Sequence, residues 1–203
     1  MNEYSFMPPA TTSTKQDKRE LILAAALELF AEHGFAGSAV PLVAEAAGVA
    51  TGTIYRYFPS KEALVNALYQ QWKGDIKRRL IDEREPAETA REEFHQWWTG
   101  LADFVRDHPV AFEFLELHHH EPYLDDVSKQ LALEVDGAAL AFALRGQEAG
   151  LVRPIPAPLL VALVFGAFTG VVRGMRTYAD FFDEDALVLA EDAVWDLVRA
   201  AGT

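Results

Sequence analysis

The chain has 203 residues, half of them hydrophobic, which is enough for a buried core, and no cysteine, which excludes disulfides and thiolate metal sites. Its formal net charge is −13, but residues 15–80 hold nine Lys+Arg against seven Asp+Glu, whereas residues 81–203 hold nine against 23. This asymmetry predicts a mildly basic N-terminal third suited to a polyanion, on an acidic body with another role.

The first 14 residues have neither the basic start nor the apolar run of a secretory signal peptide, and we expect them to form a disordered arm. The longest nearly uncharged run, residues 154–172, has three prolines in its first five positions. Its strongly apolar part, residues 159–172, is shorter than the ~20 residues that a bilayer crossing needs. We therefore expect a buried helix, no membrane contact and a soluble, cytoplasmic protein.

Helical periodicity dominates the N-terminal third. Residues 15–33 are expected to form a helix that ends at Gly34, a residue typical of helix C-termini. Ser38 is expected to cap a short second helix, and residues 51–58 to form a third. Ser60 then caps a longer helix that runs to about residue 84.

The turn between the second and third helices reads Ala47-Gly48-Val49-Ala50. Gly48 can take a positive φ there, and Val49 can fill the angle between the helices. Three short helices with such a turn form a helix-turn-helix pattern, which favours DNA binding. The alternative is a three-helix bundle with no ligand.

The acidic body also has helical period throughout, and no run shows the alternation of a half-buried strand. The sum is an all-α chain of about nine helices and no sheet. The body helices are expected over residues 87–108, 109–119, 122–150, 158–178 and 183–200.

The third helix divides into a buried face and a polar one. Ile54 and Phe58, four residues apart, are expected to face the core, and Gly52 would let the helix approach base edges closely. Hydroxyl and phenol groups, which can donate a hydrogen bond to a phosphate or a base edge, occupy the remaining faces: Thr51, Thr53, Tyr55 and Tyr57. Lys61 opens the next helix, where the helix dipole disfavours a cation, so we expect it to face an external anion.

Residues 18–68 resemble the N-terminal domain of the tetracycline-repressor (TetR) family of transcriptional regulators. The resemblance rests on Arg19, Ile22-Leu23, Ala26, Leu29-Phe30, Gly34-Phe35, Val43-Ala44, Ala47-Gly48-Val49, Gly52-Thr53-Ile54-Tyr55, Tyr57-Phe58, Ser60-Lys61-Glu62 and Leu64. It implies that Thr51 and Gly52 approach bases with Tyr55 close behind. It also implies that Thr53, Tyr57 and Lys61 contact phosphate, while Lys18 and Arg19 meet the DNA backbone. Tyr55 belonging largely to the core is the alternative.

One departure from the family pattern concerns the start of the second helix. Many relatives have a Thr-Thr-x-Arg-like run there, whereas this chain has Ser38-Ala39-Val40-Pro41 and no Arg. Ser38 and the neighbouring N–H groups could still hold one phosphate. Base reading would then depend on residues 51–57.

Small residues recur every four positions along the helix expected over residues 158–178: Ala162, Gly166, Gly170 and Gly174. Such a ridge lets another helix approach closely. Packing within the monomer is one interpretation. The family resemblance implies the other, a homodimer interface that also includes Val194, Trp195 and Val198.

The body is rich in aromatic residues, most of which are expected to form its core. The resemblance implies an apolar effector cavity among these helices, suited to a hydrophobic or planar small molecule. The predicted lining residues are Trp98, Phe112, Leu115, His118, Phe142 and Phe165.

The run LHHHEPYLDD contains six competent metal ligands. The spacing does not match a zinc-protease helix, because position 124 is Leu and Pro122 interrupts the helix. Consecutive histidines also point in different directions, so we expect no metal site and no cofactor. One histidine is expected to be a buried polar group.

These features predict four segments: an arm (1–14), a helix-turn-helix domain (15–60), a connecting helix (61–84) and a ligand-binding and dimerisation domain (85–203). We expect no enzyme but a homodimeric repressor of a palindromic DNA operator, released by a small effector. The alternatives are a regulator controlled by a protein partner and a metal-dependent helical enzyme.

Overall fold

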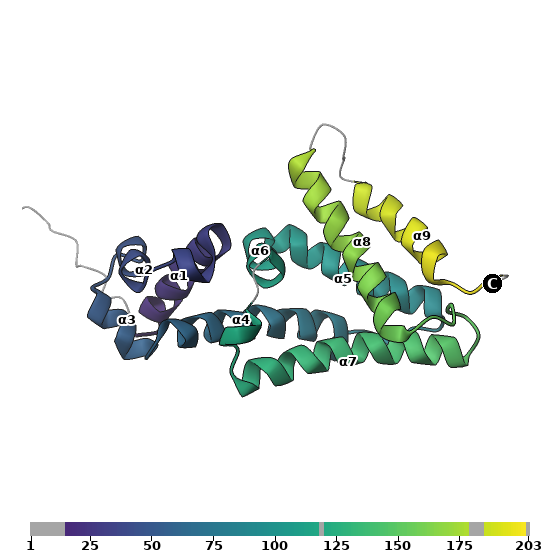
Figure 1. Ribbon diagram of the computed structural model, residues 1–203, viewed down its shortest axis with the longest axis horizontal. Helices are drawn as coiled ribbons and strands as arrows, with labels where there is room; N and C mark the ends of the chain where they lie inside the picture. The colour runs from purple at the N-terminus through teal and green to yellow at the C-terminus, as the bar shows by residue number, and fades with distance from the viewer. Residues whose placement is uncertain (1–14, 118–119, 179–184, 202–203) are drawn as a thin grey trace, which may run out of the picture.

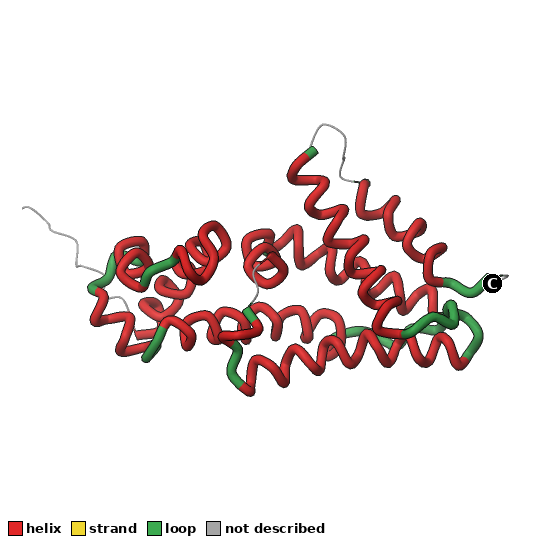
Figure 2. Tube along the Cα trace, in the orientation of Figure 1, coloured by secondary structure: helices red, strands yellow, loops and turns green. Residues whose placement is uncertain are grey.

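A computed structural model describes residues 15–117, 120–178 and 185–201, and Figure 2 shows that they are almost entirely helical. These residues form nine α-helices and two short helical turns, without a strand, which confirms the all-α prediction. A single antiparallel bridge joins Val152 to Arg199. The predicted disordered arm lies outside the described residues.

Three helices form a small bundle at one end of the elongated molecule: α1 (Lys15–Gly37), α2 (Val40–Ala46) and α3 (Thr51–Tyr57). Side chains at helical spacing meet in its core, including Ile22, Phe30, Val43 and Ile54, each at most 1% exposed. Gly34 takes φ 65°, so the regular helix is broken where the sequence predicts, and one further turn follows before α2.

The helix α4 (Lys61–Lys77) leads from this bundle into the body (Figure 1). Its first turn is capped as predicted, because the Ser60 hydroxyl accepts a hydrogen bond of 3.1 Å from the Ala63 N–H. One turn of π-helix, Arg78–Asp82, extends it to near the predicted end. The helix therefore connects the two ends of the molecule.

Five further helices build the body: α5 (Ala90–Asp107), α6 (Pro109–Leu117), α7 (Asp126–Glu148), α8 (Ala157–Thr177) and α9 (Ala186–Val198). A short 3-10 turn, Glu121–Tyr123, precedes α7. Figure 1 shows α7 running beside α4, while α8 and α9 form a pair that crosses the body steeply.

The prediction that α8 is buried is wrong. It has 21 residues and a mean hydropathy of 1.7, long and apolar enough to cross a membrane, yet only 11% of its apolar stretch is buried. Leu159 is 50% exposed and Leu163 42% exposed, while Leu160 and Phe168 face the core. The helix is apolar all round, and the monomer covers only one side of it.

Aromatic contacts fix the small bundle against the body. The rings of Phe30 and Phe114 lie 6.3 Å apart, and those of Phe35 and Tyr123 are stacked at 3.8 Å. These pairs join α1 to α6 and to the turn before α7. The bundle is therefore held by the body on the side away from α3.

A buried amide joins α4 to the beginning of α7. The Asn66 side chain, 5% exposed, donates to the carbonyl oxygens of Glu62 (2.8 Å) and Tyr123 (2.7 Å). Its oxygen accepts from the Asp125 N–H (2.8 Å) and the Ser128 hydroxyl (2.7 Å). All four hydrogen bonds of this amide are made, so α4 is positioned by a fully satisfied polar network.

Candidate nucleic-acid interface and ligand cavity

The turn between α2 and α3 has the predicted construction. Gly48 takes φ 65°, and its N–H donates to the Glu45 carbonyl at 3.1 Å. The Val49 N–H donates to the Ala44 carbonyl at 2.9 Å, and the Val49 side chain packs against the core. A left-handed glycine therefore sets the angle at which α3 leaves the bundle.

The helix α3 buries one side and presents the other. Ile54 is 1% exposed and Phe58 4%, as the four-residue spacing predicts. Tyr55 is 52% exposed, so it does not belong to the core. A Cβ added at Gly52 would meet no atom within 4 Å, so the protein leaves this surface open to a close approach.

Three hydroxyl groups complete the surface of α3. Thr51, Thr53 and Tyr57 are half-buried, and Tyr57 packs against the core, so each residue remains partly accessible to solvent. Together with Gly52 and Tyr55 they place hydrogen-bonding groups around one exposed helix. Such a helix fits the major groove of DNA in size.

Lys61 lies beside this surface. Its ammonium is 4.1 Å from the centroid of the Phe35 ring and has no carboxylate within 4.0 Å among the described residues. Burial lowers the pKa of Lys61, and the neighbouring Glu62 carboxylate partly opposes that change. The Phe35 ring holds the cation in place without neutralising its charge.

Two basic residues of α1 lie on the same end of the molecule. Lys18 is exposed, and the guanidinium of Arg19 lies 5.4 Å from the centroid of the Phe58 ring. Because Phe58 directly follows α3, this contact brings Arg19 close to the exposed helix. Neither cation has a carboxylate within 4.0 Å in the described part of the chain.

Ser38 has neither of its two predicted roles, which were to cap α2 and to hold a phosphate. Its side chain is 0% exposed, and its hydroxyl lies 2.8 Å from the carbonyl oxygens of Leu29 and Gly34, to which it can donate. The residue that caps α2 is Ala39, with no side-chain hydrogen bond. The Ser38 hydroxyl therefore stabilises the end of α1 and is not accessible to a phosphate.

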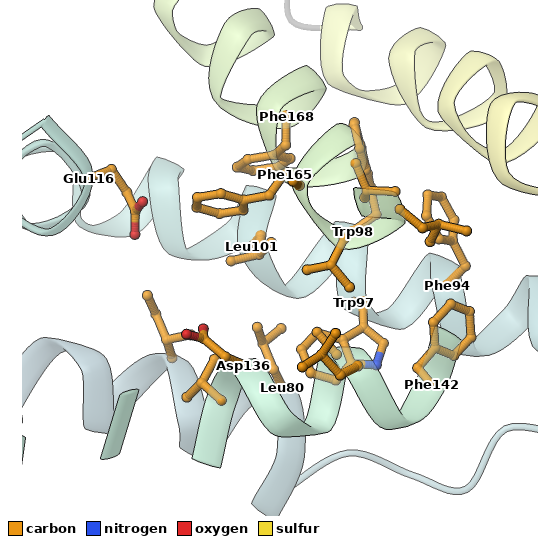
Figure 3. A pocket seen from close by; sticks show the side chains of 18 of the residues that line it. Leu80, Phe94, Trp97, Trp98, Leu101, Glu116, Asp136, Phe142, Phe165 and Phe168 are labelled. Carbon is orange, nitrogen blue, oxygen red and sulfur yellow. The ribbon is translucent and has the colours of Figure 1, made fainter. Parts of the chain in front are cut away.

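A partly open cavity of about 540 Å³ lies in the body between α4, α5, α6, α7 and α8 (Figure 3). Four predicted residues line it: Trp98, Leu115, Phe142 and Phe165. Phe112 instead lines an adjoining cavity of about 430 Å³, and Phe165 borders both. His118 lies outside the described residues.

The sequence reasoning missed the polar end of the larger cavity, which is formed by Tyr69, Lys73, Glu116 and Asp136. Burial, with the nearby Asp136 and Glu116 carboxylates, raises the pKa of Tyr69 to about 12. Burial likewise raises the pKa of Glu116, opposed by Lys73 and assisted by Asp136. The available signal was the pair of glutamates, Glu113 and Glu116, within the otherwise apolar helix α6.

The predicted homodimer interface is partly wrong. Val194 and Val198 are 7% and 1% exposed, and the ring of Trp195 lies 5.3 Å from that of Phe94, so these residues pack inside the monomer. On α8, Ala162, Gly166 and Gly170 are exposed and Gly174 is half-buried. Large apolar side chains that are exposed on the neighbouring α9 are Val188, Leu189 and Leu197.

Among the described residues, no group of three or more potential ligands is arranged to hold a metal ion. Of the histidine run, His118 and His119 lie outside those residues. His120 is 4% exposed, and its Nε2 lies 2.5 Å from the Phe114 carbonyl oxygen. This agrees with the prediction of one buried, polar histidine.

Comparison with known proteins identifies the family. The model of bacterial regulatory proteins of the tetR family matches residues 22–68, and that of the tetracyclin repressor-like C-terminal domain matches residues 60–200. The chain belongs to the TetR family. The family resemblance found at the third helix therefore extends through the acidic body.

Individual relatives share the fold at moderate identity. The HTH-type transcriptional regulator YhgD of Bacillus subtilis is 28% identical over 100 residues, which are 49% of this chain and 52% of that protein. A TetR-family structure from Vibrio parahaemolyticus is 28% identical, covers 90% of this chain and 99% of its own, and has a TM-score of 0.69.

FadR from Bacillus subtilis, solved in complex with stearoyl-CoA, is 25% identical and covers 88% of this chain and 96% of its own, with a TM-score of 0.66. The chain spans about half the length, or less, of the curated relatives that it matches. These relatives are transcriptional regulators, and the solved structures match nearly the whole fold.

Proposed function

We propose that this TetR-family chain is a homodimeric repressor that binds a palindromic operator and leaves it when a small molecule enters the body cavity. The observation that carries the proposal is the exposed face of α3, with Gly52 open to approach, beside the Lys61 ammonium, which has no carboxylate within 4.0 Å in the described part of the chain. The chain has a net charge of −13, so binding must depend on a few placed contacts rather than on bulk attraction.

The contacts divide into two classes. Thr51, Gly52 and Tyr55 lie where base edges would be met, and they supply direct readout of the sequence. Thr53, Tyr57 and Lys61, with Lys18 and Arg19 from α1, supply phosphate contacts that fix the register. The cytoplasm, where bacterial DNA lies, is the matching location.

Dimerisation is supported by the uncovered apolar face of α8 and α9. A Cβ added at Gly166 or Gly170 would meet nothing within 4 Å, and Leu163 and Leu197 are also exposed. Large exposed apolar patches mark interaction sites, and a twofold pair places two recognition helices about 34–36 Å apart, one turn of DNA.

The helix α4 supplies the connection between cavity and DNA. Tyr69, Lys73 and Leu80 line the cavity, while Lys61 begins the same helix beside α3. A ligand that fits only one position of α4 would shift the population toward that position. The separation of the two α3 helices would then no longer match successive grooves.

The test is operator binding by wild type and Lys61→Ala over a salt series. The substitution removes one phosphate-binding cation per protomer, so it should weaken binding and flatten the salt slope by roughly 0.9 for each phosphate that is no longer neutralised. Lys129→Ala is the matched control, because this exposed lysine lies on α7, away from the proposed interface. An unchanged slope in Lys61→Ala would contradict the phosphate role.

A further inference from the structure

The larger cavity has two chemically different ends. Figure 3 shows Phe94 and Phe142 at one end, while the carboxylates of Glu116 and Asp136 point into the other. Glu116 comes from α6 and Asp136 from α7, so the two acidic groups enter from different helices. An apolar body with one charged end fits an amphipathic molecule.

Among the described residues, the carboxylates that line this charged end outnumber the cations. Lys73 is the cation that lines it, and it has no carboxylate within 4.0 Å among the described residues. Glu116 and Asp136 likewise form no ion pair with any of the described residues. One cation against two carboxylates leaves one negative charge that a bound cation could balance. Because Asp136 is exposed to solvent, its attraction for such a cation is the weaker of the two.

An independent observation at the same place also indicates a ligand. The Tyr69 side chain is 8% exposed and lines the cavity. Among the described residues its hydroxyl makes no hydrogen bond, yet it is not one of their fully buried unpaired polar atoms, so it is accessible from the cavity. A phenol that is accessible from an otherwise apolar cavity can hydrogen-bond to a polar group of a molecule bound there. Burial, followed by the Asp136 and Glu116 carboxylates, raises the pKa of Tyr69 to about 12, so this phenol is neutral at neutral pH, as an ordinary one also is.

We infer that the effector of this protein is an apolar or aromatic organic amine, whose ammonium lies between Glu116, Asp136 and the Tyr69 hydroxyl. This rests on the proposed effector function of the cavity and names its ligand class. The ammonium donates to the carboxylates and the phenol oxygen, and the aromatic walls accept the apolar part. A ligand with a carboxylate at this end would meet like charge from Glu116 and Asp136.

Three probes with one skeleton and different charge test the inference: phenylhexylamine, phenylhexanol and phenylhexanoate. Calorimetric titration of the full-length wild-type chain at neutral pH should give the amine at least a roughly tenfold tighter Kd than the carboxylate, with the alcohol between them. Equal binding, tighter binding of the carboxylate, or no binding by any probe would overturn the inference.

Charge-removing variants identify the carboxylate responsible. Glu116→Gln should weaken amine binding roughly tenfold and leave the alcohol nearly unchanged, because only the charged pair is removed. Glu134→Gln, on α7 but outside the cavity lining, should change neither. An equal loss of affinity for amine and alcohol in Glu116→Gln would point to altered packing and contradict the charge-based selection.

Operator release separates this inference from the proposed function. If the amine binds as expected but does not release operator DNA, the ligand class stands and the effector role of the cavity fails. If the alcohol or carboxylate releases the operator and binds more tightly than the amine, the effector role stands and the amine class is wrong.

Discussion

The Ser38 hydroxyl lies where α1 gives way to α2, within 2.8 Å of the carbonyl oxygens of Leu29 and Gly34. The Gly34 carbonyl lies in the last turn of α1, where intrahelical partners are missing, and the Leu29 carbonyl lies before it in the same helix. A hydroxyl at this place satisfies the backbone, and its complete burial prevents contact with DNA. The residue type is the one expected of a phosphate contact, but its surroundings give it a structural role.

Ser38→Ala should therefore destabilise the fold by about 1–2 kcal/mol, since the carbonyl oxygens are left without this donor. Urea denaturation measures the change in the free energy of unfolding. The salt dependence of operator binding should stay the same. If Ser38→Ala has the stability of the wild type but binds DNA more weakly, Ser38 does contact the DNA.

Residue spacing predicted the recognition helix well and the inner face of α9 poorly. In α3, the apolar pair Ile54 and Phe58 defines a single buried side, so the exposed side follows. In α9, apolar residues occupy more than one face, and periodicity does not decide which face meets the body. Val194 and Val198 consequently face inward, while Leu189 and Leu197 face outward.

At the scale of whole helices, the position of α4 depends on the buried hydrogen-bond network of Asn66. Asn66→Ala should lower the free energy of unfolding by roughly 2–4 kcal/mol, because the partner groups of Tyr123, Asp125 and Ser128 lose their hydrogen bonds. Thermal or urea denaturation provides the measurement.

Gln70→Ala is the control for that change, because Gln70 bonds Ser128 (3.0 Å) and Asp125 from the more exposed side of the same joint. Exposed hydrogen bonds contribute less, so we expect a destabilisation of about 1 kcal/mol or less. Equal destabilisation in the two variants would show that burial of the amide does not determine the stability of the joint.

The open glycines of α8 give a prediction about assembly. Gly170→Leu should preserve the monomer fold, since nothing lies within 4 Å of the added Cβ, but should prevent the close approach of a partner helix. Sedimentation at micromolar concentration should shift from dimer to monomer. Gly137→Leu, at an equally open glycine on α7, should leave the dimer intact.

The elements themselves were predictable because turn and cap residues mark their ends. Ser60 and Gly48 act as the sequence indicates, and the nine helices of the described residues follow the apolar periodicity. The exposure of α8 was not predictable. Apolar composition indicates that water is excluded from a helix, but not whether its own chain or a second copy excludes it.

Across the whole molecule, most of the negative charge lies away from the proposed DNA-facing end. The elongated shape holds the acidic body and its cavity away from α3 (Figure 1). This arrangement reconciles the overall charge of −13 with binding to a polyanion. The sequence indicated that separation, but the cavity's polar end depends on α4, α6 and α7 meeting, which local patterns do not encode.

The central claim is that a dimer of this chain reads a palindrome with two copies of α3. Selection of bound duplexes from random-sequence DNA by the purified protein, followed by sequencing, tests it most directly. The predicted result is an inverted repeat whose half-site centres lie about 10 base pairs, or one helical turn, apart. No enriched motif, or a single unrepeated half-site, would contradict the account.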